Sequence, residues 1–323
     1  MPIPVFILSM PRAGSTLLQR LLATHPQIAT ISESHLLLPF IYPLRQRGVY
    51  AEYDHKYTHL GFRNFIAGLD GGQAAYLDAV REFALGLYGQ VAGPGARYFV
   101  DKAGALSLVV DELLKMFPDG KFVFLWRNPL AVVSSMMLSW RAGRWSVHEY
   151  EVYLFRGLPA LADAYREGAA GAAAVRYEDL VVRPEATASR IFEYLDLSPT
   201  EADVTGFSEV RLTGGLGDLP GMQKYREISH EPLSKWKATL ANPIRRSWCR
   251  RYVEFVGAER LATMGYDLAE LQAELAGLPF SLRYLASDLF RRPYTALFKL
   301  LEGRILRDKL EDLRAGRRYF LHH

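Results

Sequence analysis

The sequence predicts an α/β fold of three layers, in which a central parallel sheet lies between two layers of helices. Two observations predict it. Short apolar runs of strand length alternate along the chain with segments of helical periodicity, as in a parallel sheet with crossover helices. Three of the runs also end in polar clusters, at residues 9–16, 101–102 and 127–128. Because ligands bind beyond the carboxyl ends of parallel strands, we expect these clusters to converge on one site.

The first thirty-five residues organise this prediction. Residues 3–9 form a buried strand, a turn follows at once, and a helical pattern begins near Leu17. The free N–H groups of a first helical turn and the helix dipole favour an anion at this position. Arg12 adds a cation, and Ser15 and Thr16 add hydroxyl donors. The sequence therefore predicts an anion site in the turn.

The remaining elements follow in order. Further strands are expected at 28–31, 97–100, 121–126 and 172–176, with Asp101 and Lys102 directly after the second of these. A helix should begin at Asn128 and Pro129, because Asn is a good N-cap and Pro suits the first helical position. Other helices are expected at 73–91, 106–117, 146–168, 184–195, 240–256, 267–275 and 281–315. Residues 47–72 are expected to be irregular, and 206–235 to form a long loop over the site.

Composition narrows the class of protein. Of the 323 residues, 50% are hydrophobic and 23% are charged, as in ordinary globular proteins. The one cysteine, Cys249, excludes an intramolecular disulfide and a cysteine-built zinc site. No apolar run reaches about eighteen residues, and the N-terminus does not have the pattern of a signal peptide, so a cytoplasmic protein is expected.

The formal charge of +4 is unevenly placed. Residues 278–323 hold ten Arg and Lys against five Asp and Glu, a net charge of +5. Subtraction from the total of +4 leaves a net charge of about −1 on residues 1–277. The basic balance therefore belongs to the tail, and nucleic-acid binding by the main domain is not expected.

The first turn resembles a nucleotide P-loop only in part. That motif requires G-x-x-x-x-G-K-[ST], whereas residues 9–16 read SMPRAGST, with the final Gly and the hydroxyl residues but without the first Gly and the Lys. The predicted strand 121–126 ends at Arg127 rather than at an acidic residue that could hold magnesium. The fold is thus P-loop-like and suited to a phosphate ester without a metal. An ATP-dependent kinase is the alternative.

Arg127 and Ser135 form a second candidate anion site. A guanidinium and a hydroxyl can hold a second phosphate. The alternative is structural: an Arg that caps the helix, and a buried Ser bonded to the backbone.

Four stretches resemble the sulfotransferases that use 3′-phosphoadenosine 5′-phosphosulfate (PAPS). They are PVFILSMPRAGSTLLQRLLATHP, KFVFLWRNPLAVVSSMM, RYEDLVVRP and LSKW, within residues 4–240. The resemblance is strongest to the tyrosylprotein branch and its bacterial relatives, including sulfotransferase domains of polyketide synthases. It implies a sulfotransferase domain over 1–277 that binds PAPS as co-substrate and needs no metal.

The resemblance also implies roles for individual residues. Glu33, twenty-one residues after Arg12, matches the family's base, and Lys102 matches a lysine that assists transfer. The 5′-phosphosulfate loop corresponds to Arg12, Ala13, Gly14, Ser15 and Thr16, and the 3′-phosphate segment holds Arg127 and Ser135. Tyr177 matches an adenine-contacting tyrosine, and Ser234, Lys235 and Trp236 match the S-K-W segment. Trp236 is equally suited to stacking on adenine or to packing.

The acceptor stays open at this point. His35 stands where the tyrosylprotein branch has an acceptor-binding Arg, which speaks against a peptide tyrosine. Glu33 to Leu37 resemble polyketide-synthase domains that act on an acyl chain. The expected acceptor is a hydroxyl of a small molecule, lipid, glycan or carrier-bound acyl chain, with peptide tyrosine as the alternative.

The chemistry can be stated in physical terms. The sulfuryl group moves in line to a hydroxyl, which is a poor nucleophile, so a base must take its proton. Glu33 is the assigned base, and His35 is the rival because its ordinary pKa lies near neutrality. Arg12, Lys102 and the N–H groups of residues 14–16 would stabilise the leaving charge. His55 and His59 have the spacing of a helical metal pair but no acidic neighbour, so no metal site is expected there.

Residues 278–323 are expected to form a basic helical extension. Its apolar stripes could pack on the core or on a second subunit in a homodimer, or they could lie on an anionic membrane surface. Packing on protein is favoured over the membrane, because apolar helical stripes usually belong to a core. A non-enzymatic adaptor that works through this tail is the third functional hypothesis.

Overall fold

The fold is built on a five-stranded parallel sheet with the strand order β2-β3-β1-β4-β5. The computed structural model describes residues 1–169, 171–213 and 227–316. The strands are β1 (Ile3–Ser9), β2 (Ile28–Thr30), β3 (Tyr98–Asp101), β4 (Lys121–Trp126) and β5 (Ala173–Arg176). The predicted α/β class with a central parallel sheet is confirmed, and each predicted strand is present within one residue of its expected ends.

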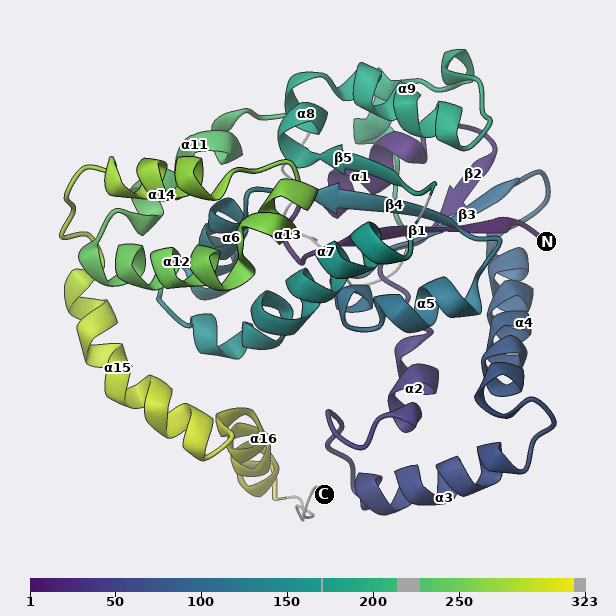
Figure 1. Cartoon of the computed structure of the whole chain (residues 1–323), viewed down its shortest axis with the longest axis horizontal. Helices are drawn as coiled ribbons and strands as arrows, with labels where there is room; N and C mark the ends of the chain where they lie inside the picture. Colours follow the sequence, from purple (N-terminus) through teal and green to yellow (C-terminus); the bar gives the residue numbers. More distant parts are fainter. Residues whose placement is uncertain (170, 214–226, 317–323) are drawn as a thin grey trace.

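Fifteen helices of the described residues connect or cover these strands (Figure 1). They are α1 (Ser15–Leu22), α2 (Leu38–Ile41), α3 (His55–Ala67), α4 (Gly72–Ala92), α5 (Val110–Met116), α6 (Pro129–Arg141), α7 (Leu158–Glu167), α8 (Tyr177–Val182), α9 (Pro184–Tyr194), α11 (Glu231–Leu240), α12 (Pro243–Val256), α13 (Ala258–Thr263), α14 (Leu268–Ala276), α15 (Leu285–Leu300) and α16 (Gly303–Arg314). Short 3-10 turns cover Tyr42–Leu44, Gly104–Leu108, Val147–Glu149, Pro199–Glu201 and Val204–Glu209.

The central strand β1 contributes to two separate cores because its side chains alternate between the faces of the sheet. Phe6 and Leu8 belong to the larger core, which includes residues of α4, α5, α6, α7 and α12. Val5 and Ile7 belong to the smaller core with α1, α8 and α9. All four side chains are fully buried, and burial of each stabilises the fold by about 1.5–3 kcal/mol. The sheet is therefore a buried middle layer whose carboxyl-end edge is formed by the loops after the strands.

Two predicted helices are interrupted in the structure. The segment expected to be one helix over 106–117 divides at Val109, whose φ of −133° is not helical, into a 3-10 turn and α5. The helix expected over 146–168 is a 3-10 turn, a π-helical turn at Tyr153–Gly157, and α7. A side chain at Gly157 would lie 2.7 Å from the Ser107 hydroxyl, so the π-turn packs closely against the 3-10 turn at Gly104–Leu108.

Two expected irregular stretches are partly helical. Residues 47–72 contain α3, which Asp54 caps by accepting a hydrogen bond from the Tyr57 N–H (3.1 Å). Within 206–235, a 3-10 turn ends at Glu209 and α11 begins at Glu231, so the S-K-W segment is helical. Both expectations were wrong in these parts, because the capping Asp and the Pro after Glu231 were not used as helix starts. Residues 214–226 of the expected loop lie outside the described residues.

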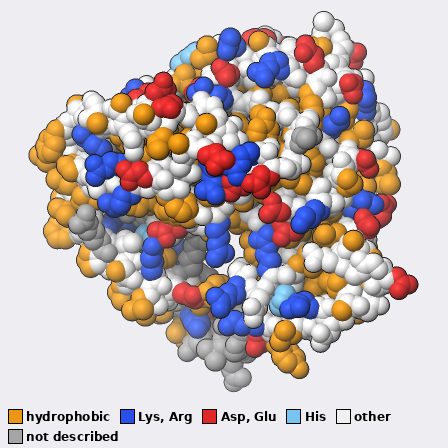
Figure 2. Space-filling model, in the orientation of Figure 1, with side chains coloured by type: hydrophobic (Ala, Val, Ile, Leu, Met, Phe, Trp, Pro, Cys, Tyr) orange, Lys and Arg blue, Asp and Glu red, His pale blue; other side chains and the backbone are white. Residues whose placement is uncertain are grey.

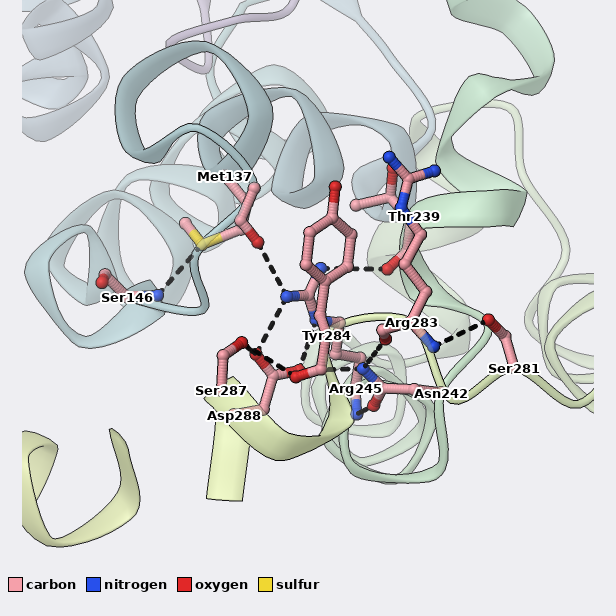
Figure 3. A network of polar contacts seen from close by, with 11 residues as sticks. Met137, Ser146, Thr239, Asn242, Arg245, Ser281, Arg283, Tyr284, Ser287 and Asp288 are labelled. Carbon is pink, nitrogen blue, oxygen red and sulfur yellow. Dashed lines mark hydrogen bonds and ion pairs between the residues drawn. The ribbon is translucent and has the colours of Figure 1, made fainter. Parts of the chain in front are cut away.

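A buried ion pair fastens the C-terminal helices to the rest of the chain (Figure 3). Arg245 of α12 donates from Nε to Asp288 of α15 (2.7 Å) and from Nη2 to the same carboxylate (2.9 Å), and both side chains have no exposed surface. Arg245 also donates to the Gly143 carbonyl (2.7 Å), and Asn242 donates to Asp288 (2.8 Å). The extension thus contacts the core, while the division of the chain at residue 277 stays a prediction.

Asp288→Ala is expected to destabilise the protein, because it leaves the Arg245 guanidinium buried without its counter-charge. The expected loss is about 3–5 kcal/mol, measured by urea unfolding. Glu231→Ala is the matched control, since its pair with Lys235 is exposed on both sides and should be worth under about 0.5 kcal/mol. Equal losses in the two variants would show that the buried pair does not hold the extension.

Candidate active site

The loop between β1 and α1 has the backbone shape of an anion-binding turn. Arg12 and Gly14 both have positive φ, at 68° and 99°. A side chain at Gly14 would lie 2.3 Å from the Tyr177 ring, so only glycine fits where the loop passes α8. Helix α1 begins at Ser15, and its first-turn N–H groups have no carbonyl partners within the helix. The turn therefore presents backbone donors to the cavity beside it.

Arg127 ties this loop to the neighbouring elements. It follows β4 and is only 8% exposed. Its guanidinium donates to the Arg12 carbonyl (2.7 Å) and to the Pro232 carbonyl (3.2 Å), and it stacks on the Tyr177 ring at 4.2 Å. Burial lowers its pKa, which shows how far the group is desolvated. Its Nε is buried without a hydrogen-bond partner among the described residues, and the side chain lines the cavity described below.

The Arg12 side chain lies along α6. Its Nη2 donates to the Ser139 hydroxyl (2.9 Å), its Nε lies 3.5 Å from the Ser135 hydroxyl, and it stacks on Trp140 at 5.8 Å. Ser135 therefore contacts Arg12 in this structure, whereas the sequence analysis paired it with Arg127. Ser139 and Trp140 were missed, although Ser139 follows Ser135 by four residues and so shares its helix face.

A carboxylate and two basic side chains meet on the other side of the loop. Lys102, at the end of β3, donates to Glu33 Oε1 (2.8 Å) and to the Thr16 hydroxyl (3.1 Å). The Nε2 of His35 lies 3.4 Å from Glu33 Oε2. Three segments thus place Thr16, Lys102 and Glu33 in one hydrogen-bonded chain, as the predicted convergence of strand ends requires.

The charges of this group are strongly coupled. Burial raises the pKa of Glu33, but the hydrogen bonds and charges of His35 and Lys102 outweigh it and lower that pKa to about 2. The hydrogen bond to Glu33 in turn raises the pKa of His35. Glu33 is therefore ionised throughout the physiological range and can accept a hydrogen bond from a hydroxyl.

Asp101, beside Lys102, supports the group from behind. It is fully buried and accepts hydrogen bonds from Tyr88 (2.6 Å) and from Ser34 (3.0 Å). Burial raises its pKa. Ser34 lies between Glu33 and His35, so this contact fixes the position of the segment that carries both, including the left-handed backbone of His35 (φ 50°).

One cavity of about 360 Å³ joins these groups, a volume typical of small-molecule sites. Most of the residues expected at the site line it: Arg12, Gly14, Ser15, Thr16, Glu33, His35, Lys102, Arg127, Ser135, Tyr177, Lys235 and Trp236. Ala13 is buried and Ser234 is exposed, and neither is among the lining residues. The roles given to all of these residues stay predictions.

Arg20 and Phe207 also line the cavity and were missed. Arg20 donates to the Ser208 carbonyl (2.6 Å) and stacks on Phe207 at 5.4 Å. Arg20 follows Thr16 by four residues on α1, so helix periodicity could have identified it. No sequence pattern points to Phe207, which lies about 190 residues away.

The candidate histidine pair has a structural role. His55 and His59 lie on α3, not in an irregular stretch, and their rings contact the carbonyls of Arg45 (2.8 Å) and Pro43 (3.0 Å). Within the described residues, no group of three His, Cys, Asp or Glu side chains could hold a metal ion.

Comparison with known proteins agrees with this geometry. The model of the sulfotransferase family matches residues 4–201. Nodulation protein NoeE of Sinorhizobium fredii is 27% identical over 330 residues, which cover 94% of this chain and 75% of that protein. Protein-tyrosine sulfotransferase 1 of Danio rerio is 25% identical over 272 residues, covering 81% of this chain and 72% of the relative.

Two solved structures share the fold. The sulfotransferase domain of the Synechococcus PCC 7002 olefin synthase has a TM-score of 0.53 at 24% identity, over 73% of this chain and 88% of that domain. The sulfotransferase domain from the curacin biosynthetic pathway has a TM-score of 0.52 at 23% identity, over 83% of this chain and 99% of that domain. Because the family model covers more than half of the sequence, the chain belongs to the sulfotransferase family.

Proposed function

We propose that this sulfotransferase uses PAPS as donor and that Glu33 takes the proton of the acceptor hydroxyl. Transfer of a sulfuryl group follows from the family, and the kinase and non-enzymatic adaptor hypotheses are set aside. The observation that carries the proposal is the chain from Thr16 through Lys102 to Glu33 (3.1 and 2.8 Å), which puts a base within reach of the anion-binding turn. The donor supplies the sulfuryl group and a phosphate leaving group when bound.

The residues fit such a donor. The turn offers the N–H groups of α1 and the hydroxyls of Ser15 and Thr16 to one anionic group. Arg127 offers a second site, because its guanidinium carries a positive charge and the side chain lines the same cavity. The Tyr177 ring lies beside both, and Trp236 lines the same cavity and is 3% exposed. Two anion sites with aromatic side chains nearby suit a nucleotide that carries two phosphates.

Each charged residue has a part in the proposed transfer. Glu33 would accept the hydroxyl proton as the oxygen bonds to sulfur, and the negative charge that develops on the leaving side would be stabilised by Lys102 and Arg12. Lys102 contacts both Glu33 and Thr16 of the turn. Its ammonium can therefore stabilise the Glu33 carboxylate before proton transfer and the charge of the leaving group after it. Ser139 and Ser135 would act as positioning residues, because they hold the Arg12 guanidinium.

For the acceptor we propose only a chemical class, namely a hydroxyl of a small molecule, lipid, glycan or carrier-bound acyl chain. The protein-tyrosine sulfotransferases act on a protein tyrosine, as their name says, so peptide tyrosine stays the alternative. We also propose that the enzyme is bacterial, like NoeE, and works in the cytoplasm.

Glu33→Gln is expected to keep nucleotide affinity and to lower kcat about 10²- to 10⁴-fold, because the amide cannot take a proton. Affinity is measured by calorimetry with 3′-phosphoadenosine 5′-phosphate, and turnover with labelled PAPS and a panel of hydroxyl compounds. Glu227→Gln is the control, since Glu227 lines the same cavity apart from the proposed chain of contacts. Unchanged kcat in Glu33→Gln would move the base to His35.

Arg127→Ala is expected to weaken binding of the same nucleotide about 10- to 100-fold, because a charge-assisted contact to phosphate is lost. Arg127→Lys should recover only part of the affinity, since an ammonium cannot make the forked contact. Arg183→Ala, on an exposed arginine, is the control. Equal affinity of the wild type and Arg127→Ala would place the phosphate elsewhere.

His35→Leu, whose side chain cannot donate a hydrogen bond to Glu33, should move the acid limb of the kcat/KM profile to higher pH. Glu33 has a pKa of about 2 and stays ionised in the wild type, so its titration should not reduce activity above about pH 4. Loss of the His35 hydrogen bond removes a contact that lowers that pKa, so the Glu33 pKa rises and its proton is retained to higher pH. His230→Leu is the control, and an unmoved acid limb in His35→Leu would contradict the assignment.

A further inference from the structure

Helix α15 packs on the protein with its more polar side. Asp288 is buried against Arg245, the Thr295 hydroxyl lies 3.4 Å from His148 Nδ1, and Lys299 pairs with Glu151 (2.6 Å). These residues are spaced by seven and four positions and so lie along one side of the helix. Phe298, which packs on His148 at 5.0 Å between ring centroids, is the apolar member of this side.

The side that faces away is apolar. Leu289, Phe290, Leu297 and Leu300 are 49%, 83%, 53% and 79% exposed. The pattern continues on α16 with Leu306, Leu310 and Leu313, which are 42–54% exposed and spaced by four and three residues. We call these seven residues the outer stripe. Figure 2 shows hydrophobic and basic side chains together along the lower-left edge, where these helices lie.

This arrangement is the reverse of an ordinary surface helix, which buries its apolar side. The orientation is fixed by the Arg245–Asp288 pair and its hydrogen bonds (Figure 3), so the helix cannot roll over without leaving two charges buried and unpaired. A contiguous exposed apolar surface held in this way marks a place of contact with something else.

The charge of the segment distinguishes between the candidates. Residues 278–323 carry a net +5, and Arg283, Arg307 and Arg314 of this segment are exposed. A second copy would bring an equally basic surface against it, and like charges oppose that contact. An anionic lipid surface attracts the cations and takes up the leucine and phenylalanine side chains, as interfacial helices do.

We propose that α15 and α16 lie on the surface of an anionic lipid bilayer, with the outer stripe inserted at the level of the head groups. The contact is peripheral: among the described residues, none of the helices combines the length and hydrophobicity that crossing a bilayer requires. The sequence analysis favoured packing of this segment's apolar stripes, on the core or on a second subunit, over a membrane surface. The exposure of the outer stripe is the reason for preferring the membrane here.

The test is co-sedimentation of the full chain with vesicles of phosphatidylcholine alone and of phosphatidylcholine mixed equally with phosphatidylglycerol. The wild type is expected to bind the mixed vesicles, more weakly as salt rises. Phe290→Ser combined with Leu297→Ser should weaken binding about tenfold or more, since two side chains can no longer insert. Phe83→Ser combined with Val91→Ser is the matched control on α4, where the side chains are 48% and 53% exposed.

Thermal unfolding and nucleotide binding of both pairs show whether they are folded, independently of vesicle binding. Equal vesicle binding by the two serine pairs would overturn the proposal, as would equal binding to the neutral and mixed vesicles. The proposal would also be overturned if the wild type did not bind vesicles but formed a dimer that the Phe290→Ser and Leu297→Ser double variant did not form. That result would assign the outer stripe to contact with a second copy.

Discussion

The contact between Lys102 and Glu33 is the interaction on which the site depends. The ammonium of Lys102 is 2% exposed and could not be buried there without an anion beside it. Its two contacts, to Glu33 and Thr16, join the end of β3, the segment after β2 and the first turn of α1. The same lysine lowers the pKa of the carboxylate and stands where leaving charge would develop. The arrangement that stabilises this part of the fold is therefore also the one that the proposed chemistry uses.

The sheet explains why these segments meet. Strands β1, β3 and β4 are parallel neighbours, so Arg12, Lys102 and Arg127 all lie beyond the same edge. This convergence could be predicted from the sequence, because each strand is a compact apolar run followed at once by polar residues. The N-cap of α6 was equally clear: Asn128 accepts a hydrogen bond from the Leu130 N–H (2.9 Å).

Other features could not be read from local pattern. The division at Val109 and the π-turn before α7 occur in segments that approach distant parts of the chain: a side chain at Gly104 would lie 2.7 Å from Pro11, and one at Gly157 would lie 2.7 Å from the Ser107 hydroxyl. Ser135 lines the cavity and contacts Arg12 (3.5 Å), a contact that the sequence did not predict, because helix periodicity defines a face and not the rotamer of the arginine opposite it. Phe207 reaches the cavity through tertiary packing alone.

The C-terminal helices show that an apolar stripe in the sequence does not by itself tell which side of a helix is buried. Their apolar stripe predicted packing on the core or on a partner, and within this chain the buried Arg245–Asp288 pair turns the polar side inward and leaves the stripe exposed. The pair also bonds the Gly143 carbonyl, just after α6, the helix whose Ser139 holds Arg12. The extension is thus connected through Arg245 and helix α6 to Arg12 in the loop of the candidate site.

The most direct test of the account is a crystal structure of the protein with 3′-phosphoadenosine 5′-phosphate. The account predicts the 5′-phosphate at the N–H groups of residues 14–16 with Lys102 in contact, the 3′-phosphate on the Arg127 guanidinium, and the Glu33 carboxylate facing the 5′-phosphate. A nucleotide bound with its 5′-phosphate away from the turn, or with Glu33 turned out of the cavity, would contradict it.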